Sequence, residues 1–347
     1  SKLSSSSEAS DGDKRQLCRK TCMKIIITGA AGQIGSSLAW RLKDKHDLVL
    51  VDNLRNGHYN KIEDLECPFY NVSVASPDFF DIFSGDYDTI IHLAGVTTLP
   101  DCECNPVDTL SSNVLGTSNV LDFSRRKGIP HVIFASTAAV YEQNKEDVLT
   151  EDLDINPRLY YSLSKKMCEE LIASYRKNYG CNVTTLRFFN IFGPDGDKER
   201  LNPPLINYVH RELMKGLPPV LCGDGEQVRD FICIDDVLAM IELCLDKKPN
   251  DTFNVCTGVT TSVNQITKWV SEELGLEHLG IKYRKSNQLW DTYPDLFEGQ
   301  YPFDKNIVVE ETEKYTKGSY EKAKRILGWE PNTNIESEVK RIARLIK

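Results

Sequence analysis

The chain has 347 residues, and its 42 lysines and arginines against 51 aspartates and glutamates leave a formal net charge of −9. This length allows one large domain or two domains of ordinary size. The acidic balance argues against a general nucleic-acid binder, because phosphate neutralisation needs a basic face. No run approaches the roughly 18 apolar residues of a membrane span, which argues against an integral membrane protein.

The 11 cysteines are scattered from Cys18 to Cys256 and include no C-x-x-C pair. Cys102 and Cys104 form a C-x-C without a His/Cys partner set close by in sequence. Disulfide frameworks are typical of short secreted chains, and no apolar signal segment leads this one. We therefore expect reduced and mostly buried cysteines, no metal site and a cytoplasmic location.

The order of strands and helices predicts the fold class. Residues 1–22 are polar and serine-rich, and we expect them to be a disordered leader or an added extension. From Met23 onward, apolar strands alternate with helical stretches, a pattern typical of a parallel sheet covered on both faces. We expect strands over residues 24–28, 48–52, 89–93, 131–136 and 183–188, and helices up to residue 43 and over 107–127 and 157–178.

A glycine-rich turn follows the first strand, where residues 25–35 read IIITGAAGQIG. Gly29, Gly32 and Gly35 let the chain turn tightly and let backbone N–H groups approach a pyrophosphate, which the positive end of the following helix also favours. Asp52 ends the next strand about 20 residues past Gly32. A carboxylate there accepts hydrogen bonds from both ribose hydroxyls and repels a 2′-phosphate, so NAD is favoured over NADP. The alternative is a structural turn with an incidental aspartate.

Proline and glycine become frequent after Asn190, which indicates a looser second lobe. We therefore expect an α/β fold in which a Rossmann-type, doubly wound parallel sheet carries a smaller mixed α/β C-terminal substrate lobe. The NAD-binding domain is expected over 23–190 and the substrate lobe over 191–347, and a strand and helix around 230–258 are expected to return to the first domain. Further helices are expected over 235–245, 262–274 and 317–328.

Three side chains form a candidate catalytic group. Tyr161 and Lys165 are four residues apart on a predicted helix and therefore project from one face. Ser136 and Thr137 follow the fourth strand, at the sheet edge where ligands of such folds bind. Tyrosine ionises near pH 10, and a nearby ammonium together with a positively charged cofactor would favour the phenolate. Alone, the Y-x-x-x-K spacing also arises from a solvated lysine beside a half-buried tyrosine.

Several motifs in order carry a family resemblance. They are TGAAGQIG (28–35), VDN (51–53), IIHLAG (90–95), NVLGT (113–117), FASTAAVY (134–141), YYSLSK (160–165), RFFNIFGP (187–194), GDGEQVRDFI (223–232) and LGWEP (327–331). From Met23 to nearly the last residue, the chain resembles the extended short-chain dehydrogenases/reductases, specifically their nucleotide-sugar epimerase/dehydratase family.

The resemblance implies a role for each matching residue. Thr137 matches the hydroxyl residue of the family triad, Tyr161 its base and Lys165 the partner of that base. Asn190 and Arg229 match residues that contact the nucleotide sugar and its diphosphate, so the expected substrate contacts are Thr137, Asn190 and Arg229. The expected cofactor contacts are Gly29, Gly32, Gln33, Ile34, Gly35, Asp52, Asn53, Asn71, Val72, Leu93, Ala94, Gly95, Asn113, Tyr161 and Lys165. For Asn113, Asn190 and Arg229 the alternative is a satisfied loop or helix residue.

The sequence also departs from the family pattern. Ala138 and Ala139 stand where dehydratases and decarboxylases typically carry an acidic residue beyond the triad threonine, which disfavours both reactions. Asn71 stands where the family often has aspartate, although an amide can still donate and accept hydrogen bonds. In place of an Arg-Pro-Gly-Asp-like element, residues 286–316 are aromatic and acidic. This aromatic segment is a substrate lid, an interface patch or a packed loop.

The resemblance favours an NAD-dependent nucleotide-diphosphate-sugar 4-epimerase that works through a transient 4-keto sugar. The alternatives are a C4 dehydrogenase that releases the keto sugar, a 4,6-dehydratase and a non-catalytic dinucleotide-binding regulator. The sequence leaves open the sugar and the nucleotide, whether UDP, GDP or dTDP. The resemblance also implies a homodimer through the helices over 107–127 and 157–178. Their apolar positions are Leu110, Val114, Leu115, Val120 and Leu121 on the first, and Leu163, Met167, Leu171, Ile172 and Tyr175 on the second.

Overall fold

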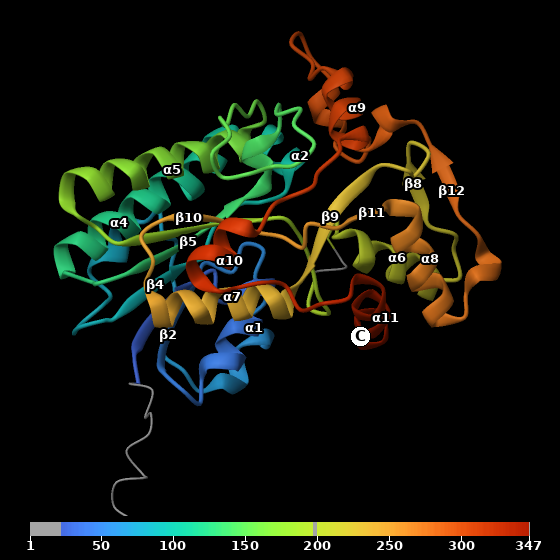
Figure 1. The fold of residues 1–347 in the computed structure, drawn as a ribbon. Coiled ribbons are helices and arrows are strands. Elements are labelled where there is room, and N and C mark those ends of the chain that lie inside the picture. The colour runs from blue at the N-terminus through green and yellow to red at the C-terminus, as the bar shows by residue number, and fades with distance from the viewer. Residues whose placement is uncertain (1–21, 197–199, 347) are drawn as a thin grey trace, which may run out of the picture.

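The computed structural model describes residues 22–196 and 200–346, so the expected leader lies outside the described residues except for Cys22. The first lobe is built on seven parallel strands in the order β10-β6-β5-β4-β1-β2-β3 (Figure 1). They are β1 (Lys24–Thr28), β2 (Asp47–Asp52), β3 (Phe69–Asn71), β4 (Thr89–His92), β5 (Val132–Thr137), β6 (Val183–Phe188) and β10 (Thr252–Val255). The chain winds outward on both sides of β1, which confirms the predicted doubly wound sheet.

Helices cover both faces of this sheet. On one face lie α4 (Gly116–Lys127) and α5 (Tyr160–Tyr179), and on the other lie α1 (Gln33–Leu42) and α7 (Ile234–Lys247) (Figure 1). Successive strand residues point to opposite faces, so Ile25 and Ile27 pack into the core with α1 and α7, whereas Ile26 packs into the core with α4 and α5. Both sides of each central strand are therefore buried, which explains its continuous apolar sequence.

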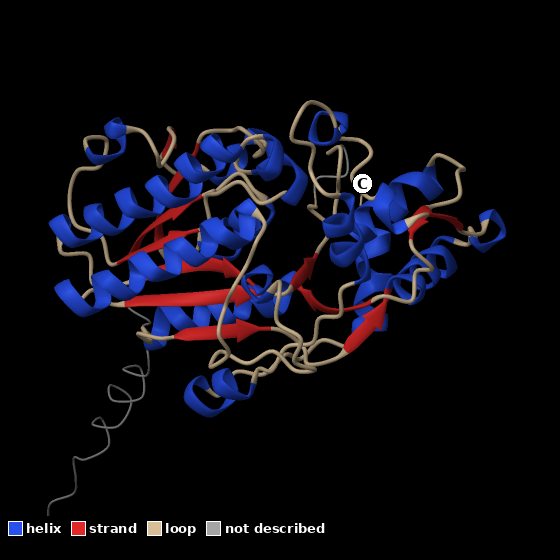
Figure 2. Cartoon of the chain, turned by 90° about the horizontal axis from the view of Figure 1, so that it is seen from above, coloured by secondary structure: helices blue, strands red, loops and turns tan. Residues whose placement is uncertain are grey.

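The second lobe contains two small sheets, in the orders β11-β9-β7 and β12-β8 (Figure 2). Its strands are β7 (Asn190–Phe192), β8 (Val220–Cys222), β9 (Val228–Cys233), β11 (Thr260–Ser262) and β12 (Lys282–Arg284). The remaining helices of this half of the chain are α6 (Leu205–Met214), α8 (Val263–Leu274), α9 (Lys305–Glu313), α10 (Glu321–Leu327) and α11 (Ile335–Leu345). This mixed α/β lobe confirms the predicted fold class.

The chain returns to the first lobe after β9. There β10 pairs in parallel with β6, and α7 packs beside α1. We therefore propose the domain division expected from the sequence, with the strand and helix around 230–258 belonging to the cofactor domain. Among the described residues no helix is both long and apolar enough to span a membrane. The ten cysteines within the described ranges are all free, and six of them are buried.

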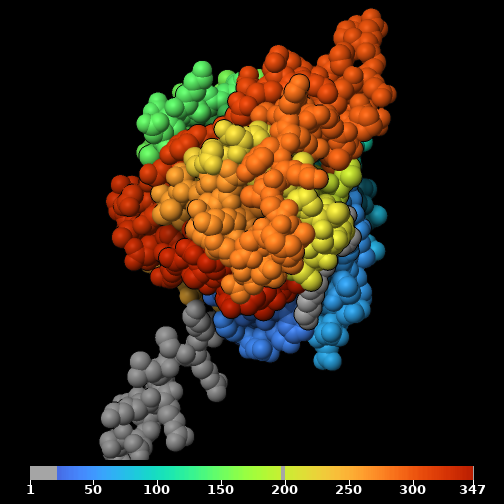
Figure 3. Space-filling view, turned by 90° about the vertical axis from the view of Figure 1, so that its right-hand side faces the viewer, coloured from blue at the N-terminus to red at the C-terminus, as the bar shows by residue number. Residues whose placement is uncertain are grey.

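Two predicted elements differ in detail from the structure. The helix expected over 107–127 consists of α3 (Pro106–Leu110), a π-helical turn (Ser111–Leu115) and α4. The aromatic segment 286–316 includes α9, and Trp290, Tyr293, Leu296 and Val308 form a small core of their own with Leu159. In the space-filling view this part of the chain stands out at the top of the molecule (Figure 3).

Candidate active site

The turn between β1 and α1 has room only for glycine at two positions. Gly29 has φ +71°, and a Cβ there would lie 2.7 Å from the backbone nitrogen of Ala94. A Cβ on Gly35 would lie 2.1 Å from the carbonyl oxygen of Gly29. The turn therefore lies against the residues that follow β4, and the first turn of α1 packs closely on the glycine turn itself.

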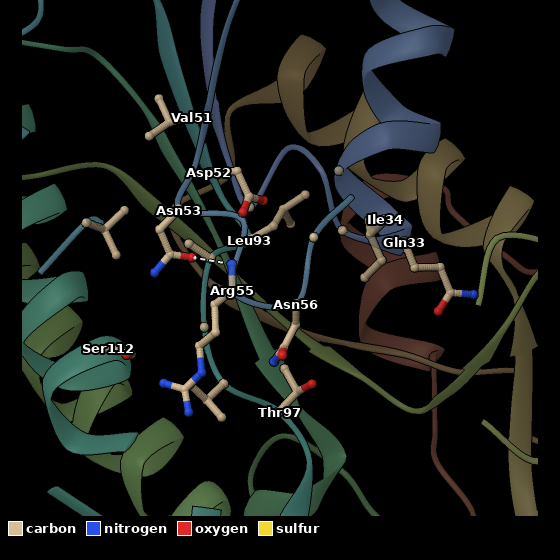
Figure 4. A pocket seen from close by; sticks show the side chains of 18 of the residues that line it. Gln33, Ile34, Val51, Asp52, Asn53, Arg55, Asn56, Leu93, Thr97 and Ser112 are labelled. Carbon is tan, nitrogen blue, oxygen red and sulfur yellow. Dashed lines mark hydrogen bonds between the residues drawn. The ribbon is translucent and has the colours of Figure 1, made fainter. Parts of the chain in front are cut away.

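A cavity of about 240 Å³ opens at this turn (Figure 4). The expected cofactor residues that line it are Gly29, Gly32, Gln33, Ile34, Gly35, Asp52, Asn53, Val72, Leu93, Ala94 and Gly95. Asn71 is exposed at the end of β3 and lies outside this lining, as do Asn113, Tyr161 and Lys165. The cavity is also lined by Arg55, Ser112 and Arg200, which no sequence motif indicates.

Asp52 is buried at the end of β2, and its carboxylate accepts hydrogen bonds from the backbone of two separate segments. One carboxylate oxygen accepts a hydrogen bond from the N–H of Ala31 at 3.0 Å, and the other accepts from the N–H of Leu54 at 2.8 Å. A carboxylate offers about four acceptor sites, so two remain for a ligand. Asp52 can thus fix the glycine turn and still accept from ribose hydroxyls.

The three residues of the candidate catalytic group lie together at the carboxyl end of β5. Thr137 ends β5 and is hydrogen-bonded to Tyr161, in the first turn of α5. The buried Lys165 Nζ donates to the carbonyl oxygen of Ala135 at 2.8 Å. A Cβ on Gly95 would lie 3.5 Å from Lys165 Nζ, so Lys165 lies directly behind the wall of the first cavity.

Burial sets the protonation of this group. It raises the pKa of Tyr161 to about 12, although the hydrogen bond with Thr137 lowers that pKa in part. Burial also lowers the pKa of Lys165. The Lys165 ammonium alone therefore does not bring the pKa of Tyr161 toward 7. The lower pKa expected from the sequence also needs the positive charge of a bound cofactor.

A buried ion pair, which no sequence motif indicates, lies next to the catalytic group. The carboxylate of Glu169, one turn after Lys165 on α5, pairs with the Arg187 guanidinium of β6 at 2.7 Å, and both side chains are about nine-tenths buried. Glu169 also accepts from the hydroxyl of Ser136. Arg187 in turn donates to the Tyr141 hydroxyl at 2.7 Å. This network ties α5, β5 and β6 together beneath the site.

Asn113 lies in the π-helical turn, a feature often found at functional sites. Its amide oxygen accepts from the N–H of Val96 at 2.8 Å, and its amide nitrogen donates to the Val96 carbonyl at 3.0 Å and to the Ser164 hydroxyl at 2.9 Å. These bonds hold the loop after β4 against α5. The expected contact of Asn113 with a cofactor stays a prediction.

A second cavity, of about 780 Å³, opens between the two lobes. Asn190 and Arg229 line it, and their contact with a substrate stays a prediction. The amide of Asn190 donates to the Asp230 carbonyl at 2.9 Å. The guanidinium of Arg229 donates to the carbonyls of Glu311 and Thr312 at 2.9 and 3.1 Å, so it also ties β9 to the end of α9.

The two cavities share part of their walls. Arg200 lines both, and Thr97 lines both from the side of the first lobe. Trp290 lines the second cavity, and its ring is buried in the small core that contains Leu159. The aromatic segment therefore forms one wall of the second cavity.

The chain is similar to known enzymes over most of its length. The model of the NAD dependent epimerase/dehydratase family matches residues 25–256. A putative UDP-glucose 4-epimerase from Methanocaldococcus jannaschii is 31% identical over 330 residues, which cover 93% of this chain and 98% of that one. UDP-glucuronic acid decarboxylase 1 from Xenopus tropicalis is 26% identical over 92% of this chain and 71% of its own. The solved UDP-glucose 4-epimerase from Thermotoga maritima, bound to UDP-glucose, has a TM-score of 0.82 at 27% identity, over 93% of this chain and 98% of that one.

Proposed function

We propose a reaction from the premise that this chain belongs to the NAD dependent epimerase/dehydratase family. The reaction is the 4-epimerisation of a nucleotide-diphosphate sugar through a transient 4-keto sugar. The observation that carries it is that Thr137, Tyr161 and Lys165 lie together, with Lys165 directly behind Gly95 in the wall of the first cavity. A second cavity, which shares Thr97 and Arg200 with the first, is large enough for a nucleotide sugar. A dinucleotide-binding regulator would need no such group.

The residues of the first cavity fit the NAD that the family uses. Helix α1 begins at Gln33 without a side-chain cap, so its first N–H groups are left for an anionic pyrophosphate. The buried amide nitrogen of Gln33 has no hydrogen-bond partner within the described ranges, and it lies beside Gly193, on the side away from Asp52 (Figure 4). The remaining acceptor sites of Asp52 suit the ribose hydroxyls. When bound, NAD takes up and returns the C4 hydride, which no side chain can do.

The side chains manage the proton and the position of the sugar. Tyr161 takes the proton of the C4 hydroxyl and returns it at the end of the reaction, as a general base and then a general acid. The Thr137 hydroxyl forms a hydrogen bond with the same C4 hydroxyl of the sugar and so holds it beside Tyr161. The Lys165 ammonium favours the phenolate form of Tyr161. The nucleotide, held in the second cavity, keeps the keto sugar bound while the sugar presents its other face.

The residues beyond Thr137 favour epimerisation over elimination. Ala138 and Ala139 follow Thr137 directly, and their methyl groups offer no proton donor or acceptor. A dehydratase or decarboxylase would need an acidic group at this point. A C4 dehydrogenase shares the first half of the epimerase reaction, so the two differ only in whether the keto sugar leaves.

A panel of UDP-, GDP- and dTDP-sugars tests the proposal, with sugar products and NADH absorbance followed together. We expect one nucleotide sugar to convert to its C4 epimer without net formation of NADH. Stoichiometric NADH with a released keto sugar would instead identify a C4 dehydrogenase. If no sugar in the panel is converted or oxidised, the proposed activity is wrong.

The role of Asp52 gives a prediction about cofactor choice. Asp52→Ala removes the acceptor for the ribose hydroxyls, so the Kd for NAD should rise about 10- to 100-fold, since a hydrogen bond to a charged group contributes about 1.5–3 kcal/mol. The preference for NAD over NADP should weaken in the same variant. Calorimetric titration with both dinucleotides measures this, and thermal unfolding shows whether the variant is folded. Tighter binding of NADP than NAD by the unmodified protein would contradict the assignment.

We also propose that the chain forms a homodimer through α4 and α5. Val120, Leu121 and Ile172 are buried against the sheet, but Leu115 is 47% exposed, and Leu163, Met167 and Leu171 are only half-buried. This leaves an outer apolar stripe, where the helices run side by side (Figure 1). Such a stripe suits a self-complementary two-fold interface.

Light scattering at micromolar concentration should therefore give about twice the mass of one chain. The double variant Leu115→Glu/Met167→Glu should give the mass of one chain, because it places buried charges in the interface. Leu217→Glu, at a 50% exposed position of the second lobe, is the matched control and should stay dimeric. A single-chain mass for the unmodified protein would make the dimer proposal wrong.

A further inference from the structure

An ion pair lies at the edge of the first cavity and has no part in the proposed reaction. Arg55, in the loop after β2, lines the cavity and pairs with Asp108 on α3. Ser112, one helical turn beyond Asp108, lines the cavity from the other side. Figure 4 shows the Arg55 side chain extending from its loop toward the helix that carries Ser112. The pair therefore joins the loop in one wall of the site to α3, which lies one helical turn before Ser112 in another wall.

The loop that carries Arg55 is held in an unusual conformation. Leu54 has φ 56°, in the left-handed region that a residue with a branched side chain seldom adopts. The Asp52 carboxylate accepts from the N–H of Leu54 at 2.8 Å, and the Asn53 amide oxygen accepts from the N–H of Arg55 at 3.2 Å. Such strained residues are typical of ligand clamps, where the surrounding bonds hold them in place. Here they hold the loop that directs Arg55 toward Asp108.

We propose that Arg55 and Asp108 form a clasp that slows the release of the bound dinucleotide. The inference rests on the proposed function in taking NAD as the ligand. A 4-epimerase uses one cofactor molecule for both halves of its reaction, so slow release serves it, whereas a C4 dehydrogenase has to renew its cofactor after each turnover. The side chains of the pair are 35% and 48% exposed, so water and salt weaken the interaction and its effect is modest.

Release can be measured without any sugar. The protein is loaded with NADH and mixed with a large excess of NAD, and the loss of bound NADH fluorescence gives the dissociation rate. We expect Arg55→Ala and Asp108→Ala each to speed release about 3- to 10-fold at low salt, and 0.5 M salt to reduce the difference. The double variant should release no faster than the faster single variant, because both changes remove the same interaction.

Asp108→Ala separates the clasp from a direct bond between Arg55 and a cofactor phosphate. Freed from its partner, a phosphate-binding Arg55 would hold the dinucleotide equally well or better, so unchanged or slower release in Asp108→Ala overturns the clasp. Additive effects in the double variant would overturn it as well. Lys324→Ala is the matched control, since it breaks an exposed ion pair with Glu330 in the C-terminal part of the chain and should leave release unchanged.

The two proposals can fail separately. If the unmodified protein epimerises a nucleotide sugar but Asp108→Ala releases NADH at the unmodified rate, the clasp is wrong and the function stands. If both single variants release NADH faster while no sugar in the panel is converted, the clasp stands and the function is wrong.

Discussion

Tyr161→Phe should lower kcat by about 10²- to 10⁴-fold or more while NAD binding stays close to that of the unmodified protein. Phenylalanine keeps the ring and its packing but removes the hydroxyl that accepts and returns the proton, and general acid–base catalysis typically contributes a factor of this size. Steady-state kinetics with the nucleotide sugar identified by the panel measures kcat, and titration with NAD measures the affinity.

Tyr160→Phe is the matched control, because Tyr160 precedes Tyr161 on the same helix but is 37% exposed. It should keep a near-normal rate. The pH profile gives a second readout: burial raises the pKa of Tyr161 and a bound cofactor's positive charge opposes that rise, and kcat/KM should increase with pH as the phenol ionises. The Phe variant should lose this increase. A near-normal rate in Tyr161→Phe would remove Tyr161 from the role of base.

Local patterns in the sequence predicted the core of the fold well. The strands over 24–28 and 183–188 have the predicted bounds, because both are rich in the β-branched and apolar residues that favour buried strands. The positions of the glycine turn and of Asp52 were predicted from the same strands, because the turn follows the first strand and Asp52 ends the second. Helix α11 was missed, although Ile335, Val339 and Ile342 recur at helical spacing and are buried.

Features that depend on contacts between distant parts of the chain were not predicted. Tyr141, Glu169 and Arg187 lie on three different elements, so no spacing in the sequence connects them.

The π-helical turn around Asn113 changes the backbone hydrogen-bond register without interrupting the helical pattern of side chains. The raised pKa of Tyr161 follows from burial by the surrounding structure, which the four-residue spacing to Lys165 does not reveal.

Among changes outside the catalytic group, Arg187→Met should cause a large loss of stability, about 3–5 kcal/mol in the free energy of unfolding. Arg187 and Glu169 are paired at 2.7 Å and nearly buried, so removing the guanidinium leaves an uncompensated carboxylate in the interior. The Tyr141 hydroxyl also loses its donor. Urea unfolding at matched protein concentration gives the free-energy difference between the variant and the unmodified protein.

A double variant shows whether the lost stability comes from the unpaired charge. Arg187→Met/Glu169→Leu removes both charges and should recover a large part of the loss, because a buried ion pair can often be replaced by apolar side chains at little net cost. Lys268→Met breaks the exposed pair with Glu272 and should cost less than about 1 kcal/mol. If Arg187→Met costs no more than this control, the pair does not stabilise the fold. The double variant also tests the link to the site: if its stability recovers but its kcat stays low, the pair positions α5 and the Tyr161 that α5 carries.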